Sequence, residues 1–487
     1  MGFEVLGIAS QALAAQQLAL QVTSNNMANA TTPGYHVESA NLTENAPTPD
    51  SIMPSTLLGN GVTVTAVTRA TNAFLSSSVR NQTSAVGYYT ALTQGVNQVQ
   101  NVFQEPQQGG LAETMNQFNQ SWLTLSQNPT SLTARQGVIQ NGQTLASTLN
   151  NMQGTLSTIE NGVNKNITTQ VQQVNQLAQQ IAQMNKQIAT VSTSGQQPND
   201  LLDQRGQLLT QLSQLTNVSY ANGPANSLDV YIGSHPLVTG EQTYQINVAQ
   251  VPVPNSSGVS TFTADQPTWA DNKAPVQIQS GSLAGNMALV YSQTVSGSTG
   301  GAITPGYLTG YGQSLDALTL ALANTVNNAQ AAGYNLSGTK SVGTTGTPVP
   351  FFNGTTAGTI TVNPNLTPAQ LGAASTAASP GDGTNAQNLF NTLSNSSLTI
   401  GAATATLSGY YQSLVGQVGL NGQNANNQLS DGKSTLTSLN NALQSSTGVD
   451  LNQQAVNMIQ EQQTYQAAAK MVAAQQSIIQ SLLSAVN

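Results

Sequence analysis

The chain has 487 residues, a formal net charge of −8 and only 6% charged residues, whereas ordinary soluble proteins carry about 25%. Its ten basic residues are scattered singly, which argues against nucleic-acid binding. The absence of cysteine excludes disulfides and thiol catalysis, and two histidines are too few for the common zinc sites. We therefore expect no cofactor and no metal.

The polar surface is built from Gln, Asn, Ser and Thr. Neutral amides lose less on desolvation than charges do, so this composition fits a subunit buried by neighbours as well as a secreted bacterial protein with a neutral surface. No run of about twenty apolar residues is apparent. The N-terminus lacks a basic region, because the first Lys or Arg is Arg69. We expect neither membrane insertion nor a cleaved signal peptide.

The N-terminal segment, residues 3–29, is predicted to be a helix. Leu6, Leu13, Leu20 and Met27 recur every seven residues and would share one face. Asn, Thr and Pro33-Gly34 end the helix, because proline cannot continue it.

The C-terminal segment shows the same seven-residue spacing over more than four heptads. One row comprises Met458, Tyr465, Val472, Ile479 and Val486. The other row comprises Ala455, Gln462, Ala469, Gln476 and Leu483. Because both seams lie at the extreme ends of the chain, we expect the two helices to pair as a coiled coil. An amphipathic helix on a globular core is the alternative.

The middle of the chain is predicted to be a helical body with a β-rich insertion. Helical spacing covers 111–125, 138–159 and 167–191, a further helix follows Asp200 as its cap, and helices return at 313–332 and 407–443. Alternation at 228–232, 244–248 and 276–278 indicates strands. In 340–385, rich in Gly, Thr and Pro, we expect a short strand in "TITV" and Thr367 as a cap.

The fold class is therefore mainly α with a β-rich insertion, in a nested order. We predict a terminal coiled-coil domain of 1–40 plus 450–487. A helical body of 41–217 plus 291–449 would include an irregular β-containing segment at about 340–400. Residues 218–290 would form a β-rich outer domain.

The stretch "SNNMANATTPGY" at 24–35 resembles the signature of the flagellar rod, hook and hook-associated axial proteins. Eight residues match it: Ser24, Asn25, Asn26, Asn29, Thr32, Pro33, Gly34 and Tyr35. The C-terminal stretch resembles the partner signature through Gln463, Tyr465, Gln466, Ala467 and Ala469. Segments 199–220, 281–290 and 314–338 are similar to hook-associated members. His36, Val37 and the turn at 333–338 depart from the family pattern.

The resemblance implies a structural adaptor, without catalysis, that joins the hook to the filament. It also implies export by the type III route, an extracellular position in the flagellum and self-assembly as a ring. Its partners would be itself, the hook protein, a second junction protein and a cytosolic chaperone on the C-terminal helix. The expected interaction residues are Leu6, Leu13, Leu20, Ser24, Asn25, Asn26, Met27, Asn29, Pro33, Gly34, Tyr35, Met458, Gln463, Tyr465, Gln466, Ala469, Val472, Ile479 and Leu483.

Three alternatives stay open at this point. The first is another axial protein such as the hook protein, which the long middle helices disfavour. The second is a secreted adhesin or carbohydrate-binding module that uses Tyr231, Tyr244 and Trp269, although core packing explains these aromatics better. The third is a hydrolase in the insertion. Its acidic residues, which include Asp229, Glu241, Asp265 and Asp271, show no spacing suited to acid–base catalysis.

Overall fold

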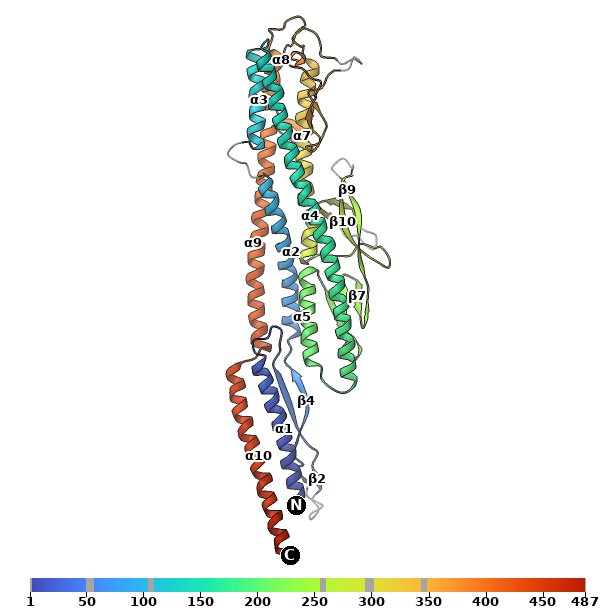
Figure 1. The fold of residues 1–487 in the computed structure, drawn as a ribbon, viewed down its shortest axis with the longest axis vertical. Helices are drawn as coiled ribbons and strands as arrows, with labels where there is room; N and C mark the ends of the chain where they lie inside the picture. Colours follow the sequence, from blue (N-terminus) through green and yellow to red (C-terminus); the bar gives the residue numbers. More distant parts are fainter. Residues whose placement is uncertain are drawn as a thin grey trace. The chain divides into compact units, whose positions relative to one another are not determined.

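The computed structural model describes residues 2–49, 57–103, 109–254, 260–293, 302–342 and 348–486. Helices dominate, with small β-sheets between them (Figure 1). The predicted fold class, mainly α with β-rich insertions, is confirmed. The chain divides into two compact units: Met1–Ala85, Val174–Gln245 and Gly432–Asn487 form the first, and Val86–Gln173 and Ile246–Asp431 form the second. The three predicted domains follow other boundaries and stay a prediction.

The first unit contains the paired ends of the chain. Helix α1 (Gly2–Ala28) packs along helix α10 (Leu451–Val486), and the two termini lie at the same end of this pair (Figure 1). Strands β1 (Glu38–Glu44) and β4 (Val62–Arg69) form an antiparallel ribbon that also contacts α1. A shorter pair is formed by β2 (Thr48–Pro49) and β3 (Leu57–Leu58). The predicted terminal helices and their pairing are thus observed.

The seam of this pair is made of small and amide side chains. Helix α1 buries Ala9, Ala15, Ala19 and Val22. On α10 the first predicted row is half-buried at Met458, Val472 and Ile479. The second covered row lies one residue before the predicted one, at Gln454, Glu461, Ala468 and Gln475. Alanine and glutamine occur in both candidate rows, so the hydrophobicity of the side chains could not predict which of the two rows faces α1.

By length and composition alone, Glu4–Ala28 of α1 could cross a membrane. This differs from the expectation that the chain has no such run. The same test is passed by core helices of soluble proteins and by N-terminal signal sequences, so on its own it is weak evidence. In the structure this helix packs against α10, β1 and β4.

The first unit also holds helix α5 (Asn199–Leu215) and a four-stranded sheet in the order β5-β6-β7-β8. Its strands are β5 (Ser219–Asn222), β6 (Leu228–Ile232), β7 (His235–Thr239) and β8 (Gln242–Thr243), with the short helix η1 (Pro224–Asn226) after β5. The predicted strand at 228–232 is confirmed, with Leu228, Val230 and Ile232 buried. The expected cap Asp200 is wrong: α5 begins at Asn199, and Asp200 lies in its first turn.

Three long helices continue from one unit into the other. They are α2 (Ala73–Phe103), α4 (Leu132–Thr193) and α9 (Leu407–Thr447). Helix α4 is continuous over 62 residues, whereas the sequence predicted two helices there. Neither α2 nor the β1–β4 ribbon was predicted.

The second unit is a helical bundle with short hairpins. Its other helices are α3 (Leu111–Gln127), α6 (Gly281–Val290), α7 (Tyr307–Ala332), α8 (Thr384–Asn395) and η2 (Pro368–Gln370). Its strand pairs are β9 (Ile246–Pro254) with β10 (Ser260–Trp269), β11 (Tyr291–Gln293) with β12 (Ile303–Pro305), β13 (Phe352–Asn353) with β14 (Thr361–Val362), and β15 (Leu398–Ile400) with β16 (Ala403–Ala405).

Two predictions in the second unit have opposite outcomes. Thr367 and Gln370 form a reciprocal capping box around η2, so the predicted cap is confirmed. The strand expected at 276–278 is wrong, because these residues form a loop. Val276 is buried and its N–H bonds to the carbonyl of Pro267. The alternation of apolar and polar residues at 276–278 therefore reflects packing of this loop on β10 and not the hydrogen-bond ladder of a further strand.

The core of the second unit combines an aromatic cluster with buried charges. Phe118, Trp122, Phe351 and Phe352 pack with ring centroids 4.7–6.2 Å apart. Glu160 of α4 is only 6% exposed, and burial together with the charge of Asp316 raises its pKa from 4.5 to about 7. Such a buried acid makes the stability of this unit depend on pH.

Candidate assembly site at the exit from the first helix

The candidate site is the exit segment, residues 30–38, which leads from α1 into β1. Its central residue is Asn26 in the last turns of α1, which is 1% exposed. The Asn26 amide oxygen accepts hydrogen bonds from the Tyr35 hydroxyl and the Glu38 N–H, both at 2.9 Å. Its amide nitrogen donates to the Glu38 carbonyl at 2.8 Å and to Gln454 Oε1 at 3.1 Å.

All four hydrogen bonds that an asparagine side chain can make are therefore formed. They join α1, the exit segment and the start of α10, and the pair with Glu38 imitates one rung of a β-ladder. We call Asn26 and these three partners the exit node. Because the node is buried, losing any partner would leave a polar group without compensation.

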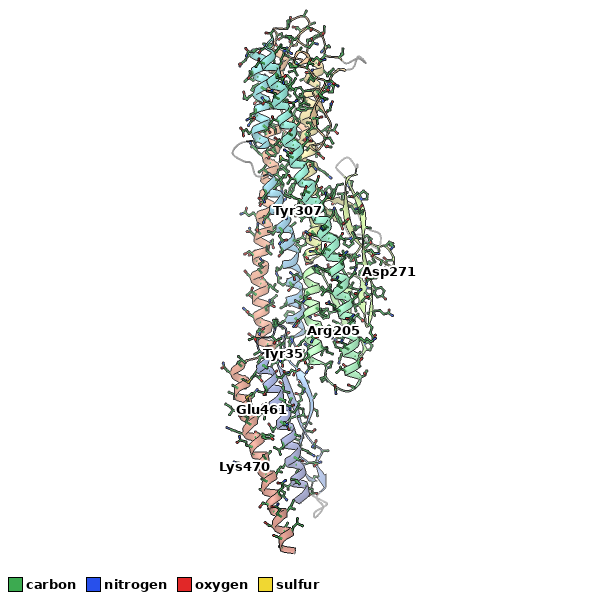
Figure 2. All side chains as sticks on the ribbon, in the orientation of Figure 1. Tyr35, Arg205, Asp271, Tyr307, Glu461 and Lys470 are labelled. Carbon is green, nitrogen blue, oxygen red and sulfur yellow. The ribbon has the colours of Figure 1, made fainter. Side chains whose placement is uncertain are left out.

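Neighbouring signature residues support the node. Asn29 donates to the side-chain oxygen of Asn25 at 2.9 Å, and Thr32 donates to the side-chain oxygen of Asn29 at 3.1 Å. These local bonds hold the turn that follows the helix. Burial, reinforced by the charge of Glu38, raises the pKa of Tyr35, so its hydroxyl keeps the proton that it donates to Asn26. Figure 2 shows Tyr35 at the end of the terminal pair.

Helix α5 holds the exit segment from another side through a row of polar residues spaced by four. Asn199 donates to the Val67 carbonyl of β4 at 2.9 Å. Asp203 accepts from the His36 N–H at 3.0 Å, contacts His36 Nδ1 at 2.7 Å and pairs with Arg69. Gln207 donates to the Pro33 carbonyl. Spacing by four places all three on one face of the helix.

His36, a departure from the family pattern, thus has a defined role. It supplies two of the three polar contacts on the Asp203 carboxylate, which is only 9% exposed, and Arg69 supplies the third. A buried carboxylate needs such compensation. Close by, Arg205 is buried, and this burial together with the charge of Arg69 lowers the pKa of Arg205 to about 10.

Gly34 allows the chain to turn at this point. Its φ is +75°, a conformation that side-chain-bearing residues rarely adopt. A Cβ here would also lie 2.6 Å from Gln207 Nε2. The glycine is therefore required by the backbone and by the approach of α5.

The exit segment also meets the join between α9 and α10. The Val37 N–H donates to the Thr447 carbonyl at 2.9 Å, and the Val37 carbonyl accepts from the Ala70 N–H at 2.8 Å. The last turn of α9 has no basic residue, so this N–H satisfies one of its free carbonyls. One short segment thus contacts α1, β4, α5, α9 and α10.

A groove of about 600 Å³ opens beside this segment, and we call it the exit groove. It is lined by residues 30–36, by the first turns of α2, by α5 and by the end of α9. Val79 and Leu443 provide apolar lining. Of its charged lining residues, Asp203 pairs with Arg69, whereas Arg80 donates to the neutral Tyr220 hydroxyl, lies over the Tyr220 ring at 4.7 Å and leaves its buried Nε without a hydrogen-bond partner.

The structure brings only part of the expected interaction residues together. Asn25, Asn26, Asn29 and Tyr35 are joined by hydrogen bonds, and Pro33 and Gly34 contact Gln207. The half-buried members are Leu6, Leu13, Leu20, Met27, Met458, Ala469, Val472 and Ile479. The exposed members are Ser24, Gln463, Tyr465, Gln466 and Leu483. Their roles in assembly stay a prediction.

Helix α10 leaves much apolar surface uncovered within the chain. Its exposed large side chains, each 38–62% exposed, are Leu451, Val456, Ile459, Tyr465, Met471, Ile478, Leu482 and Leu483. Glu461 instead faces α1 and accepts from Thr23 at 3.0 Å (Figure 2). Burial raises the pKa of Glu461, and the Thr23 hydrogen bond partly offsets this.

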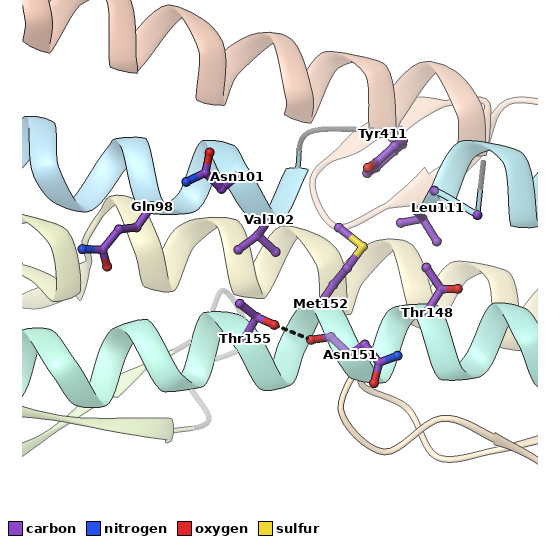
Figure 3. A pocket seen from close by; sticks show the side chains of 11 residues that line it. Gln98, Asn101, Val102, Leu111, Thr148, Asn151, Met152, Thr155 and Tyr411 are labelled. Carbon is purple, nitrogen blue, oxygen red and sulfur yellow. Dashed lines mark hydrogen bonds between the residues drawn. The ribbon is translucent and has the colours of Figure 1, made fainter. Parts of the chain in front are cut away.

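The described residues were also examined for a cavity with charged groups, for an exposed aromatic site and for a cluster of metal ligands. A cavity of about 530 Å³ in the second unit is lined by uncharged side chains of α2, α4 and α9 (Figure 3). Trp269, one of the aromatics considered for a sugar site, is 3% exposed, while Tyr231 and Tyr244 are half-buried. Asp265 accepts from Thr168 at 2.8 Å. No group of three or more potential metal ligands occurs among the described residues.

Comparison with known proteins identifies the family. A model described as the flagellar hook-associated protein FlgK helical domain matches residues 96–348. Flagellar hook-associated protein 1 of Bacillus subtilis (strain 168) is 30% identical over 512 residues, which cover 100% of this chain and 98% of that protein. The chain belongs to the flagellar hook-associated protein 1 family. The prediction from the two terminal motifs is thus confirmed, within the hook-associated group that the middle segments indicated.

Other matches agree with this membership. The family's protein from Salmonella typhimurium is 28% identical over 353 residues, which cover 71% of this chain and 60% of that protein. The Burkholderia pseudomallei flagellar hook junction protein FlgK has a similar fold, with a TM-score of 0.62 and 17% identity over 76% of this chain and 100% of that one.

The two ends of the chain match family models of flagellar basal body rod proteins. Residues 6–36 match the flagella basal body rod protein, and 441–485 match the flagellar basal body rod FlgEFG protein C-terminal model. Membership makes this a structural protein of the bacterial flagellum that associates with other axial components. The exit node joins residues from both shared ends, Asn26 and Gln454.

Proposed function

We propose that this chain is the structural adaptor that joins the flagellar hook to the filament, and that it has no catalytic activity. It assembles as a ring of identical subunits along the flagellar axis. The terminal pair lies in the segments that match the basal body rod models, so it contacts the inner layer of the tube. The helical second unit, which shares residues 96–173 and 246–348 with the family's helical domain, adapts the ring to two different neighbours.

The exit node is the observation that carries this proposal. An adaptor must pass force between an inner layer and the rest of its body without letting the connection slip. Here a short segment is held by the side chain of Asn26, by the polar row of α5 and by a free carbonyl of α9. Buried and fully satisfied hydrogen bonds of this kind define one geometry.

The proposed partners are those that would cover the apolar side chains that the terminal pair leaves exposed on α10. The apolar face of α10 is covered by neighbouring copies, by the hook protein and by the second junction protein after assembly. Before export, a cytosolic chaperone covers it. Export follows the type III route without a cleaved signal peptide, and the assembled protein is extracellular. The low charge content supports such burial, because neutral amides are cheaper to desolvate than charges.

The test is electron microscopy of cells that lack this chain, with flagellin measured in the culture medium. Hooks without filaments, and flagellin lost to the medium, are expected. Missing hooks would instead place the chain among rod or hook proteins. Normal filaments would refute the adaptor role and would redirect attention to binding by the β-rich segments.

A further inference from the structure

The exit groove and the start of α2 together indicate how one copy contacts the next. The groove is lined by residues 30–36 and by Leu443, Gln444, Thr447 and Gly448, which fall in the segments that match the basal body rod models. It is therefore continuous with the part of the chain that associates with axial components. Its lining combines the apolar side chains of Val79 and Leu443 with the guanidinium of Arg80, which already lies over one aromatic ring, that of Tyr220, at 4.7 Å. Apolar surface beside a guanidinium suits an aromatic occupant, because a cation is attracted to the face of an aromatic ring.

A side chain of this kind lies on the same helix. Phe74, in the first turn of α2, is 77% exposed, which is the highest exposure among the large apolar side chains of the described residues. Asn72 fixes this turn by accepting the Leu75 N–H at 3.0 Å on its side chain and the Ser76 N–H at 2.9 Å on its carbonyl. A large aromatic on a rigid turn is typical of an interface anchor.

The groove and the phenylalanine face opposite ways. At about 100° per residue, the groove residues Ser76, Val79 and Arg80 lie roughly 200°, 140° and 240° around α2 from Phe74. With a rise of about 1.5 Å per residue, all four lie within roughly 9 Å along the axis. A projection on one side of a helix and a groove on the other side, at the same level, permits a head-to-tail contact, and such contacts repeat around a ring or along a helical array.

We propose that the exit groove receives Phe74 of a second copy of this chain. The inference rests on the proposed ring assembly and names its contact. The ring of Phe74 covers Val79 and Leu443 of its neighbour, beside Pro33 and Tyr35 of the exit segment. The same contact then recurs from copy to copy, and each subunit supplies one projection and one groove.

Cross-linking tests the contact directly, because the natural chain has no cysteine. Gln444 lines the groove, whereas Ala442 is exposed on the same helix and does not. A cysteine at the exposed neighbour Ala73 leaves Phe74 in place. In flagella isolated from cells that make A73C/Q444C, oxidation should give a ladder of dimers, trimers and larger species. Either single variant can give dimers at most, and A73C/A442C serves as the matched control. A ladder from the control as strong as from the test pair would overturn the assignment.

Blocking the groove gives an independent test. Gly206 lines the groove from α5, and a Cβ there would meet no atom within 4 Å. G206F should fill the groove and G206A should not, so only the larger residue should lower the amount of the chain on isolated hooks, by tenfold or more. F74D should lower it similarly, while L132D, at another exposed leucine, should leave it unchanged. Secretion and circular dichroism check that each variant is exported and folded.

The two proposals fail in different ways. If cells without this chain make normal filaments, the adaptor role fails. If the natural chain restores filaments in those cells, while F74D and G206F assemble equally well and A73C/Q444C gives no ladder, the adaptor role stands and the contact is refuted.

Discussion

Replacing Glu160 by glutamine should change how the stability of the chain depends on pH. Burial and the nearby charge of Asp316 raise the pKa of Glu160 from 4.5 to about 7 in the folded state. Below pH 4.5 the side chain is protonated whether the chain is folded or unfolded. Between these values only the folded state keeps the proton, so the free energy of unfolding falls as the pH rises and is lowest above pH 7.

The size of the effect follows from the difference in pKa. At about 1.4 kcal/mol for each pKa unit, ionising Glu160 in the folded state costs roughly 3 kcal/mol. Glutamine has nearly the same shape and cannot ionise. The E160Q variant should therefore gain up to about 3 kcal/mol relative to the natural chain between pH 5 and pH 8.

The assay is denaturant unfolding of the full chain and of E160Q at several pH values from 5 to 8. Comparing the pH dependence of the two proteins cancels the contributions of other carboxylates. E241Q is the matched control, because the Glu241 side chain is 56% exposed and should change little. D316N should give a smaller gain at high pH, since it removes the charged neighbour. Parallel profiles for E160Q and the natural chain would refute the reasoning.

Three further predictions concern the exit segment and the chain ends. N26A leaves four polar atoms of the three partner residues without this side chain and should destabilise the terminal pair by roughly 2–4 kcal/mol, seen as faster hydrogen exchange in α1 and α10; S24A, at an exposed site of the same helix, should change it little. G34A must adopt φ +75°, so it should cost about 1–2 kcal/mol and lower the melting temperature. Limited proteolysis of dilute monomer should first trim about forty residues from each end, because a seam of alanines and amides gives little apolar stabilisation; full protection would contradict this.

Much of the fold could be predicted where hydrophobic spacing decides the structure. Both terminal helices, their pairing and most helices of the body follow from seven-residue or 3.6-residue periods. The ribbon of β1 and β4 was missed although "VTVTAVTR" at 62–69 alternates clearly. Phe351 and Phe352 were assigned to an irregular segment, yet they are buried against Phe118. Flanking Gly, Thr and Pro hid them, since the pattern there resembles a loop.

The candidate site shows a deeper limit of such reasoning. The signature asparagines were expected to help end the first helix, but the bridge from Asn26 to α10 depends on a partner 428 positions away. Asn199, Asp203 and Gln207 were not predicted as site residues. Their spacing by four was a usable signal, but polar residues on a helix face usually point to solvent. Only the approach of His36 and Pro33 makes this row functional.

The long separation between the partners of the exit node has a consequence for how the chain matures. Thr23 and Glu461, which bond beside the node, are 438 positions apart. A chain that is delivered end first cannot close this contact until almost its whole length has arrived, and contacts between such distant residues form late in folding. A copy that ends before Gln454 has the residues of its first helix but cannot form the hydrogen bonds that join this helix to α10.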